Sequence, residues 1–261
     1  MRTVYNPTMR KATSTWAVAL AACALAAPAA GWSSQDRAAA APSPGLPQGS
    51  EPVNLDPADF TTRIDNPYWP MRPGSRWVYR ESSDEGPPNR IVVTVTNRTK
   101  RVAAGVVARV IHDRATQAGR VVEDTQDWYA QDSEGNIWYL GEATKAYKRG
   151  RVSSTKGSWE AGVDGAQAGV IMPAHPRVGM TYRQEYRRGV AEDRGSVLSL
   201  GKRVKVPAGS FAQVLTTRDW TPLEPDAAEH KSYARGTGPV LSLDVTGGGR
   251  EELLRFTRGG R

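Results

Sequence analysis

Val121–Tyr147 reads VVEDTQDWYAQDSEGNIWYLGEATKAY and predicts a β-hairpin. One aromatic strand ends at Trp128-Tyr129, and a second runs through Ile137–Leu140. The polar stretch 132–136, DSEGN, lies between them. Aromatic and β-branched residues favour a pleated, packed surface, whereas Asp, Ser, Gly and Asn favour the tight reversal between two strands. An antiparallel β-fold is therefore the starting expectation.

Strand-like segments separated by turns continue on both sides of this hairpin. Residues 91–96, IVVTVT, alternate with a period of two, and turn residues follow at 97–100. No stretch of ten or more residues shows a clean helical period. The pattern predicts an all-β fold, an antiparallel meander that closes into a barrel or half-barrel. Residues 156–176, KGSWEAGVDGAQAGVIMPAHP, do not alternate and predict a long loop, either a plug or lid over a pocket or a linker packed on the sheet.

Part of the hairpin recurs about 104 residues further along the chain. Tyr129 and the alanine after it are matched by Tyr233 and its alanine, 104 positions later. Segments around positions 74 and 105 recur at offsets of 105 and 104. These offsets suggest that residues 68–155 and 176–258 arose by internal duplication. The alternative is that these residue types recur because strands and turns favour them.

Residues 1–40 have the composition of a signal peptide. A basic leader precedes an Ala/Leu/Val run at 16–30, which is too short for a comfortable membrane span, and small-residue cleavage sites follow. The single cysteine, Cys23, ends the sequence LAAC, which fits a lipoprotein processing box and would leave a lipid-anchored amino terminus. The alternative is a small residue within the apolar run. Either interpretation predicts an extracytoplasmic protein, secreted or held at the cell envelope.

The mature chain is expected to hold a flexible linker at 41–58 and a β-rich domain at 59–261, without a disulfide. Cleavage after residue 40 leaves 31 basic and 26 acidic residues, a net charge of +5. This scattered, mildly basic charge is compatible with a lipid, a glycan or a cell-wall polymer as partner, and with peripheral or anchored membrane contact. No nucleic-acid-binding motif accompanies it.

The sequence lacks the familiar catalytic motifs. There is no Gly-x-Ser-x-Gly, His-Glu-x-x-His or glycine-rich phosphate loop, and the three histidines are too dispersed to predict a metal site, so neither metal nor cofactor is expected. If the duplication is real, Glu229-His230 occupies the strand equivalent to the one with Glu123 and Asp127. A carboxylate that orients an imidazole would act as a general base in a secreted hydrolase. Charges that discourage edge-to-edge pairing are the alternative.

Tryptophan and tyrosine outnumber phenylalanine, with eight Trp and nine Tyr against three Phe. Trp and Tyr combine an apolar body with a polar end and are common in wet apolar clefts. This predicts a non-catalytic binding module for an apolar or glycan ligand. The expected site lies beneath the 156–176 loop and is lined by Trp128, Trp138, Trp159 and Tyr186. Packing of these rings in the core, in a purely structural surface protein, is the alternative.

The run 66–79, NPYWPMRPGSRWVY, resembles the opening of a family of secreted or lipid-anchored bacterial proteins with the pattern NPY-x-P-x-x-PG-x-x-W-x-Y. Residues 127–132, DWYAQD, 157–166, GSWEAGVDGA, and 182–186, YRQEY, are also similar to that family, as is EHK at 229–231. The resemblance implies an extracytoplasmic β-rich domain and supplies no activity or catalytic set. The rhythm of strands and glycines is similar to that of envelope half-barrels that handle lipids.

Overall fold

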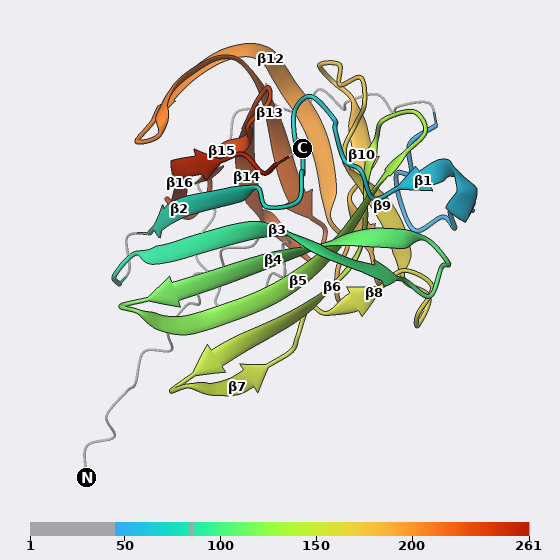
Figure 1. The fold of residues 1–261 in the computed structure, drawn as a ribbon, viewed down its shortest axis with the longest axis horizontal. Helices are drawn as coiled ribbons and strands as arrows, with labels where there is room; N and C mark the ends of the chain where they lie inside the picture. The colour runs from blue at the N-terminus through green and yellow to red at the C-terminus, as the bar shows by residue number, and fades with distance from the viewer. Residues whose placement is uncertain (1–44, 84–85, 261) are drawn as a thin grey trace.

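The computed structural model describes residues 45–83 and 86–260, so the signal-peptide region, with Cys23, lies outside the described residues. The chain is all-β, and its strands form one antiparallel, barrel-shaped sheet (Figure 1). The expected all-β meander is therefore confirmed. In chain order the strands are β1 (Phe60–Thr61), β2 (Arg76–Ser82), β3 (Asn89–Arg101), β4 (Val107–Gln117), β5 (Arg120–Asp132), β6 (Ile137–Lys148), β7 (Arg151–Ser154), β8 (Trp159–Glu160), β9 (Gln167–Met172), β10 (Thr181–Arg183), β11 (Glu185–Tyr186), β12 (Arg194–Val206), β13 (Gly209–Thr221), β14 (Glu224–Ala234), β15 (Gly238–Asp244) and β16 (Arg250–Thr257).

Neighbouring strands in the sheet follow the order β10-β12-β13-β14-β15-β16-β2-β3-β4-β5-β6-β9-β11. The two ends of this order, β10 and β11, are consecutive in the chain. Thr181–Arg183 pairs with β12, and Glu185–Tyr186 pairs with β9. One extended segment, 181–186, therefore joins both edges of the sheet and nearly closes the barrel. We call this segment the seam.

The central hairpin forms as β5 and β6, with a turn at Asp132–Asn136. The Asp132 carboxylate accepts hydrogen bonds from the Asn136 backbone N–H and side-chain amide, both at 2.8 Å. Beyond the turn, the register shifts between Asp127 and Tyr129, opposite Gly141. Gly141 has φ +134°, and a Cβ there would lie 2.4 Å from the backbone oxygen of Trp159. Glycine at this bulge thus lets β8 approach β6.

The two halves of the barrel match in strand length and position. β3 and β12 each have 13 residues and start 105 residues apart, and β5 and β14 start 104 residues apart. Tyr129 and Tyr233 contact the same ring, Trp69, at centroid distances of 5.7 and 5.8 Å and interplanar angles of 52°. This correspondence supports the proposal of an internal duplication.

The stretch expected to be a long loop, 156–176, instead contains β8 and β9. β9 pairs with β6 on one side and with β11 on the other. Its residues from Ala168 to Met172 are all buried. A strand that is covered on both faces shows no polar alternation, which is why the period-two pattern is missing from this stretch.

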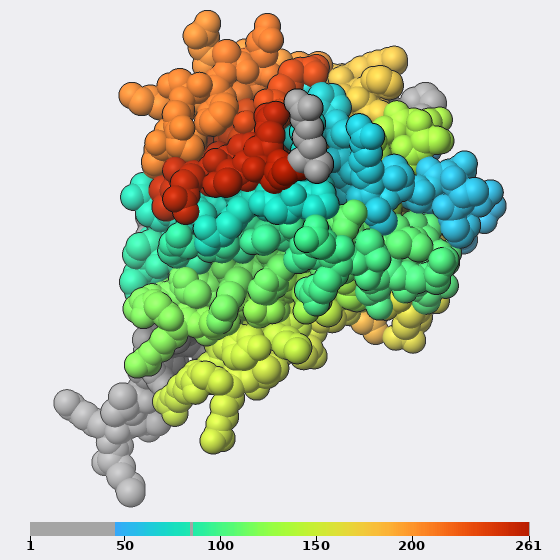
Figure 2. All heavy atoms as spheres, viewed as in Figure 1, coloured from blue at the N-terminus to red at the C-terminus, as the bar shows by residue number. Residues whose placement is uncertain are grey.

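Residues 64–71 cap one end of the barrel. Ile64, Tyr68, Trp69 and Met71 are each at most 4% exposed. Trp69 lies against Tyr129 and Tyr233, which stand near the ends of β5 and β14. In Figure 2 this cyan segment lies beside the red β16, and the Gly259 N–H donates to the Ser75 hydroxyl at 3.0 Å. We call residues 64–71 the capping segment.

Candidate functional site

Two adjoining hollows lie beside the capping segment. The smaller has a volume of about 220 Å³ and the larger about 430 Å³. They share Asp65, Pro67 and Arg235, so we treat them as one cleft, the capping cleft. Its other walls come from the capping segment, the chain just before β2, the β5–β6 turn, the chain after β9, β12, the β14–β15 turn and the end of β16. They include Tyr68, Pro70, Arg72, Gln131, Glu134, His175, Arg177, Leu200, Phe256 and Arg258.

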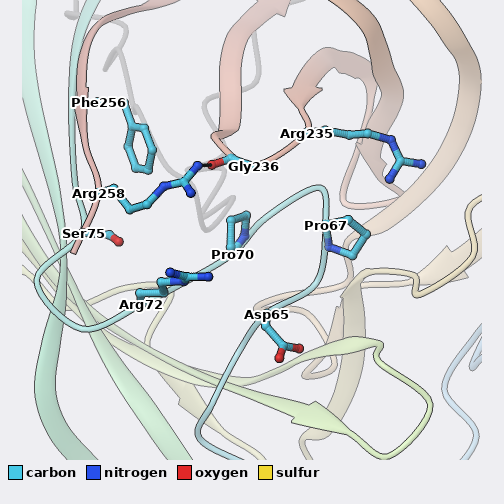
Figure 3. Close-up of a pocket in the computed structure, with 9 residues that line it drawn as sticks. All are labelled: Asp65, Pro67, Pro70, Arg72, Ser75, Arg235, Gly236, Phe256 and Arg258. Atoms are coloured by element: carbon cyan, nitrogen blue, oxygen red, sulfur yellow. Dashed lines mark hydrogen bonds between the residues drawn. The ribbon is translucent and has the colours of Figure 1, made fainter. Parts of the chain in front are cut away.

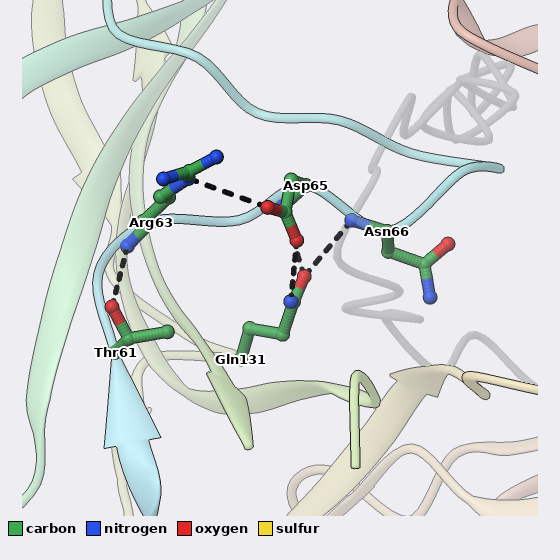
Figure 4. Close-up of polar contacts among 5 residues, drawn as sticks. All are labelled: Thr61, Arg63, Asp65, Asn66 and Gln131. Carbon is green, nitrogen blue, oxygen red and sulfur yellow. Dashed lines mark hydrogen bonds and ion pairs between the residues drawn. The ribbon is translucent and has the colours of Figure 1, made fainter. Parts of the chain in front are cut away.

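Side-chain hydrogen bonds hold the backbone of this cleft in place (Figure 4). The Gln131 amide oxygen accepts from the backbone N–H groups of Asp65 and Asn66, both at 2.9 Å. Its NH₂ group donates to the Asp65 carboxylate at 2.8 Å. The Asn66 side chain donates to the carbonyls of Gly135 and Pro173. One irregular segment is thus bound to β5, to the hairpin turn and to the end of β9, and the cleft is largely pre-formed.

Arginine side chains dominate the charge of the cleft. Figure 3 shows Arg72 and Arg258 both extending toward Pro70. Arg258 donates to the Gly236 carbonyl at 2.9 Å, and the Arg235 guanidinium lies over the Tyr68 ring at 4.4 Å. Arg177 lines the larger hollow.

Two acidic residues, Asp65 and Glu134, also line the cleft. Asp65 also forms an ion pair with Arg63 at 3.3 Å. The cleft therefore has a positive excess and suits a negatively charged ligand.

The aromatic residues expected to line a ligand site are spread over the barrel wall. Trp128 lies under the Lys100 ammonium at 4.4 Å, and Trp138 donates to the Asp132 carboxylate at 2.7 Å. Trp159 packs edge-on against Tyr139. Successive residues of a strand point to opposite faces, so Tyr139 and Trp138 lie on opposite faces of β6. These three tryptophans are at most 9% exposed, and Tyr186 sits in the seam. None of the four lines the capping cleft.

The residues expected to form a catalytic pair point in different directions. Glu229 contacts Lys231 at 3.4 Å, whereas His230, between them, faces the other side of β14. Burial, Lys202 and Arg218 lower the pKa of His230, so its neighbours are mainly cationic. Asp127 is buried in the barrel, where Tyr139 donates to it at 2.8 Å. Glu123 lies on the same face of β5 as Asp127 and is half-buried.

The barrel wall contains a buried acid cluster that the sequence-based reasoning largely missed. It consists of carboxyl side chains that are each at most 8% exposed: Asp113, Asp127, Glu142, Glu185, Asp193, Asp219 and Glu251. Burial is the main cause that raises the pKa of Asp127 and Asp193, each to about 7. Burial and neighbouring carboxyls raise the pKa of Glu142 and Glu185 well above the ordinary range.

Lys231 is the buried cation that pairs with this cluster. Its ammonium lies 3.1 Å from the Asp219 carboxylate, and the two side chains are 3% and 1% exposed. Both Asp219 and Glu229 raise the pKa of Lys231, against the effect of burial. A second cation that is buried within the described part of the chain, Arg183, donates to the backbone carbonyls of Glu51 and Ala168.

A signal for the buried acids does exist in the sequence. Asp113 stands two residues from Ile111 and from Ala115, in phase with the buried positions of β4. Glu251 stands in the same relation to Leu253 of β16. A carboxylate in phase with apolar strand residues predicts a buried acid.

Within 45–83 and 86–260, no group of three or more His, Cys, Asp or Glu residues is arranged to hold a metal ion. Across the same residues, no helix has the length and apolar character needed to cross a bilayer. The described residues do offer polar groups in the capping cleft and buried carboxyl groups in the acid cluster.

No family model and no curated protein matches this chain. Among solved structures, a protein from Parabacteroides distasonis ATCC 8503 described as a "putative lipoprotein" is similar, with a TM-score of 0.39 and 10% sequence identity, over 73% of this chain and 98% of that chain. The function proposed next rests on the residues of this chain.

Proposed function

We propose that this protein is an exported, non-catalytic binding module of the cell envelope, and that the capping cleft binds an anionic glycan. The observation that carries this proposal is that Arg72, Arg235 and Arg258 all line one proline-framed cleft. A guanidinium presents several N–H donors in a planar fork, which matches carboxylate and phosphate groups.

The other walls of the cleft suit a sugar chain. Phe256, which is half-buried, offers a ring surface in the smaller hollow. The larger hollow, about 430 Å³, falls within the roughly 300–1,000 Å³ typical of ligand sites. The hydrogen bonds from Gln131 and Asn66 hold the cleft in shape before the ligand arrives, which lowers the entropic cost of binding.

Export is supported by the composition of residues 1–40, a basic leader followed by a short apolar run and small residues. A mildly basic domain outside the cytoplasm would meet the anionic polymers of the envelope. The placement of His230 away from Asp127 gives the hydrolase alternative no support.

Binding of defined oligosaccharides to the mature domain tests this function. The probes are a tri-uronide, a glycerol-phosphate trimer and a neutral trisaccharide of the same length, measured by titration calorimetry at low and at physiological salt. We expect an anionic probe to bind more tightly than the neutral one, and its affinity to fall as salt rises. Failure of both anionic probes to bind at millimolar concentration would refute the anionic-glycan assignment.

Paired variants locate the site. Arg235→Gln and Arg258→Gln should each weaken binding about tenfold, since a hydrogen bond to a charged group contributes roughly 1.5–3 kcal/mol. Arg120→Gln is the control, because Arg120 is exposed at the β4–β5 turn, at the opposite end of β5 from the cleft. Equal affinity of all three variants and the wild type would place the ligand elsewhere.

A further inference from the structure

The seam is joined to the rest of the barrel by carboxyl groups on its two sides. Glu185 belongs to β11, which pairs with β9, and Asp193 immediately precedes β12. The Asp193 carbonyl accepts the Gln184 N–H at 2.8 Å, so the two stretches lie side by side. The Glu185 N–H lies 3.4 Å from the same carbonyl, so the two buried acids are neighbours. Two adjacent carboxyl groups can hydrogen bond to each other only when one of them is protonated.

A second carboxyl pair in the same cluster shows the same requirement. The Tyr139 hydroxyl lies 2.8 Å from an Asp127 oxygen and 3.0 Å from a Glu142 oxygen. A hydroxyl has one proton and can donate only once. The second contact is a hydrogen bond only if one of the two carboxyls is protonated and donates to Tyr139. The Tyr139 contacts therefore assign at least one proton to the Asp127–Glu142 pair.

The surroundings of Glu185 and Asp193 are mainly acidic. Glu142 of β6 and Asp219 of β13 face the pair. Lys231 of β14 and the Thr221 hydroxyl favour the ionised form of Asp193, so the shared proton belongs to Glu185. Further titratable groups act on the pair or its acidic neighbours, among them Tyr129, Asp127, Tyr139, Glu123, Tyr182, Glu229 and Tyr233.

The buried acid cluster also contains polar atoms without a partner. Within the described part of the chain, the hydroxyls of Tyr129 and Tyr182 and one Glu185 oxygen are buried and make no hydrogen bond. Tyr182 lies in the seam itself, against Gly195 of β12. Unsatisfied groups at a junction lower the free energy needed to open it.

We propose that the seam is a proton-dependent latch, which stays closed while Glu185 and Asp193 share a proton and opens when that proton is lost. The loss places two adjacent carboxylates across the junction of β11 and β12, with Glu142 close by. Repulsion in a buried, poorly solvated place is relieved when residues 181–186 separate from one edge and water enters. The rest of the barrel, from β2 to β6, keeps its ladder hydrogen bonds.

Hydrogen exchange followed by mass spectrometry, on the mature domain at pH 6, 7.5 and 9, tests this latch. Rates are corrected for intrinsic exchange at each pH. We expect the protection of peptides that cover 181–186 and 194–206 to fall about tenfold or more between pH 6 and pH 9. Above the pH at which the shared proton is lost, each further pH unit shifts the equilibrium between closed and open seam about tenfold. Peptides from β3 and β4 should keep their protection.

Neutral variants separate the latch from general alkaline instability. Asp193→Asn and Glu185→Gln remove the second charge, and each should keep the seam protected at pH 9 to within about twofold of its value at pH 6. Asp226→Asn is the control, because Asp226 is exposed on β14, and it should respond as the wild type does. Three outcomes would overturn the proposal. The seam of the wild type could keep the same protection at every pH, or β3 and β4 could lose protection as much as the seam does. The third outcome is that both neutral variants lose seam protection as strongly as the wild type.

Discussion

Lys231→Met is the most informative single change in the barrel, because it removes one charge from a buried pair. The Lys231 ammonium lies 3.1 Å from Asp219, and neither side chain is more than 3% exposed. Methionine has a similar length and no charge, so the variant creates little empty space and leaves the Asp219 carboxylate without its cation. Removing one partner of a buried ion pair costs about 3–5 kcal/mol. We expect a loss of that size in the free energy of unfolding at pH 7.5. Urea denaturation followed by tryptophan fluorescence at pH 7.5 measures this loss.

A double variant completes the test. In Lys231→Met with Asp219→Asn, neither partner is charged, so most of the stability lost at pH 7.5 should return. The single Asp219→Asn variant supplies the fourth corner of the cycle. A loss below about 1 kcal/mol in Lys231→Met, or a double variant whose loss equals the sum of the single losses, would refute the view that this pair is buried and coupled.

Three further predictions concern the stability of the barrel. Burial raises the pKa of Asp127 from about 3.8 to about 7. The wild type should therefore lose about 4 kcal/mol of stability from this group as pH rises from about 4 to 7. In Asp127→Asn the midpoint of urea denaturation should depend less on pH. In Gly169→Ala a Cβ would lie 2.4 Å from the backbone of Gln184, so the melting temperature should fall by several degrees. Gly201 has open space around it, so the control variant Gly201→Ala should leave the melting temperature unchanged. Trp69→Ala removes the ring between two tyrosines and should cost about 3–5 kcal/mol in urea denaturation, and a cost below 1 kcal/mol would mean that the capping segment contributes little to the core.

The parts of the fold that could be predicted from sequence are those set by local chemistry. The β5–β6 hairpin follows from aromatic strands around an Asp-to-Asn turn, and the turn closes through the side chain of Asp132 itself. β9 could not be predicted as a strand, because it is buried on both faces and therefore lacks polar alternation. Strand pairing across the seam depends on residues far apart in sequence, which no local pattern reveals.

The candidate site was harder to foresee than the fold. The capping cleft brings Arg72, Arg235 and Arg258 together from segments up to 186 positions apart, and single exposed arginines carry no signal of such a convergence. The buried acids do have a local signal, since Asp113 is in phase with apolar neighbours. That phase identifies a buried acid, but its partners depend on barrel closure, so Glu185 and Asp193 could not be paired from sequence.

The seam also covers the two ends of the strand order. A β-sheet normally ends in two strands with free N–H and C=O groups, which recruit strands from other molecules and start aggregation. Here the two end strands are β10 and β11, three and two residues long, and both belong to one continuous segment. The chain thus covers its own edges with the same six residues, 181–186. A substitution that frees this segment would expose β9 and β12 together, and the first visible consequence would be a soluble protein that begins to form aggregates.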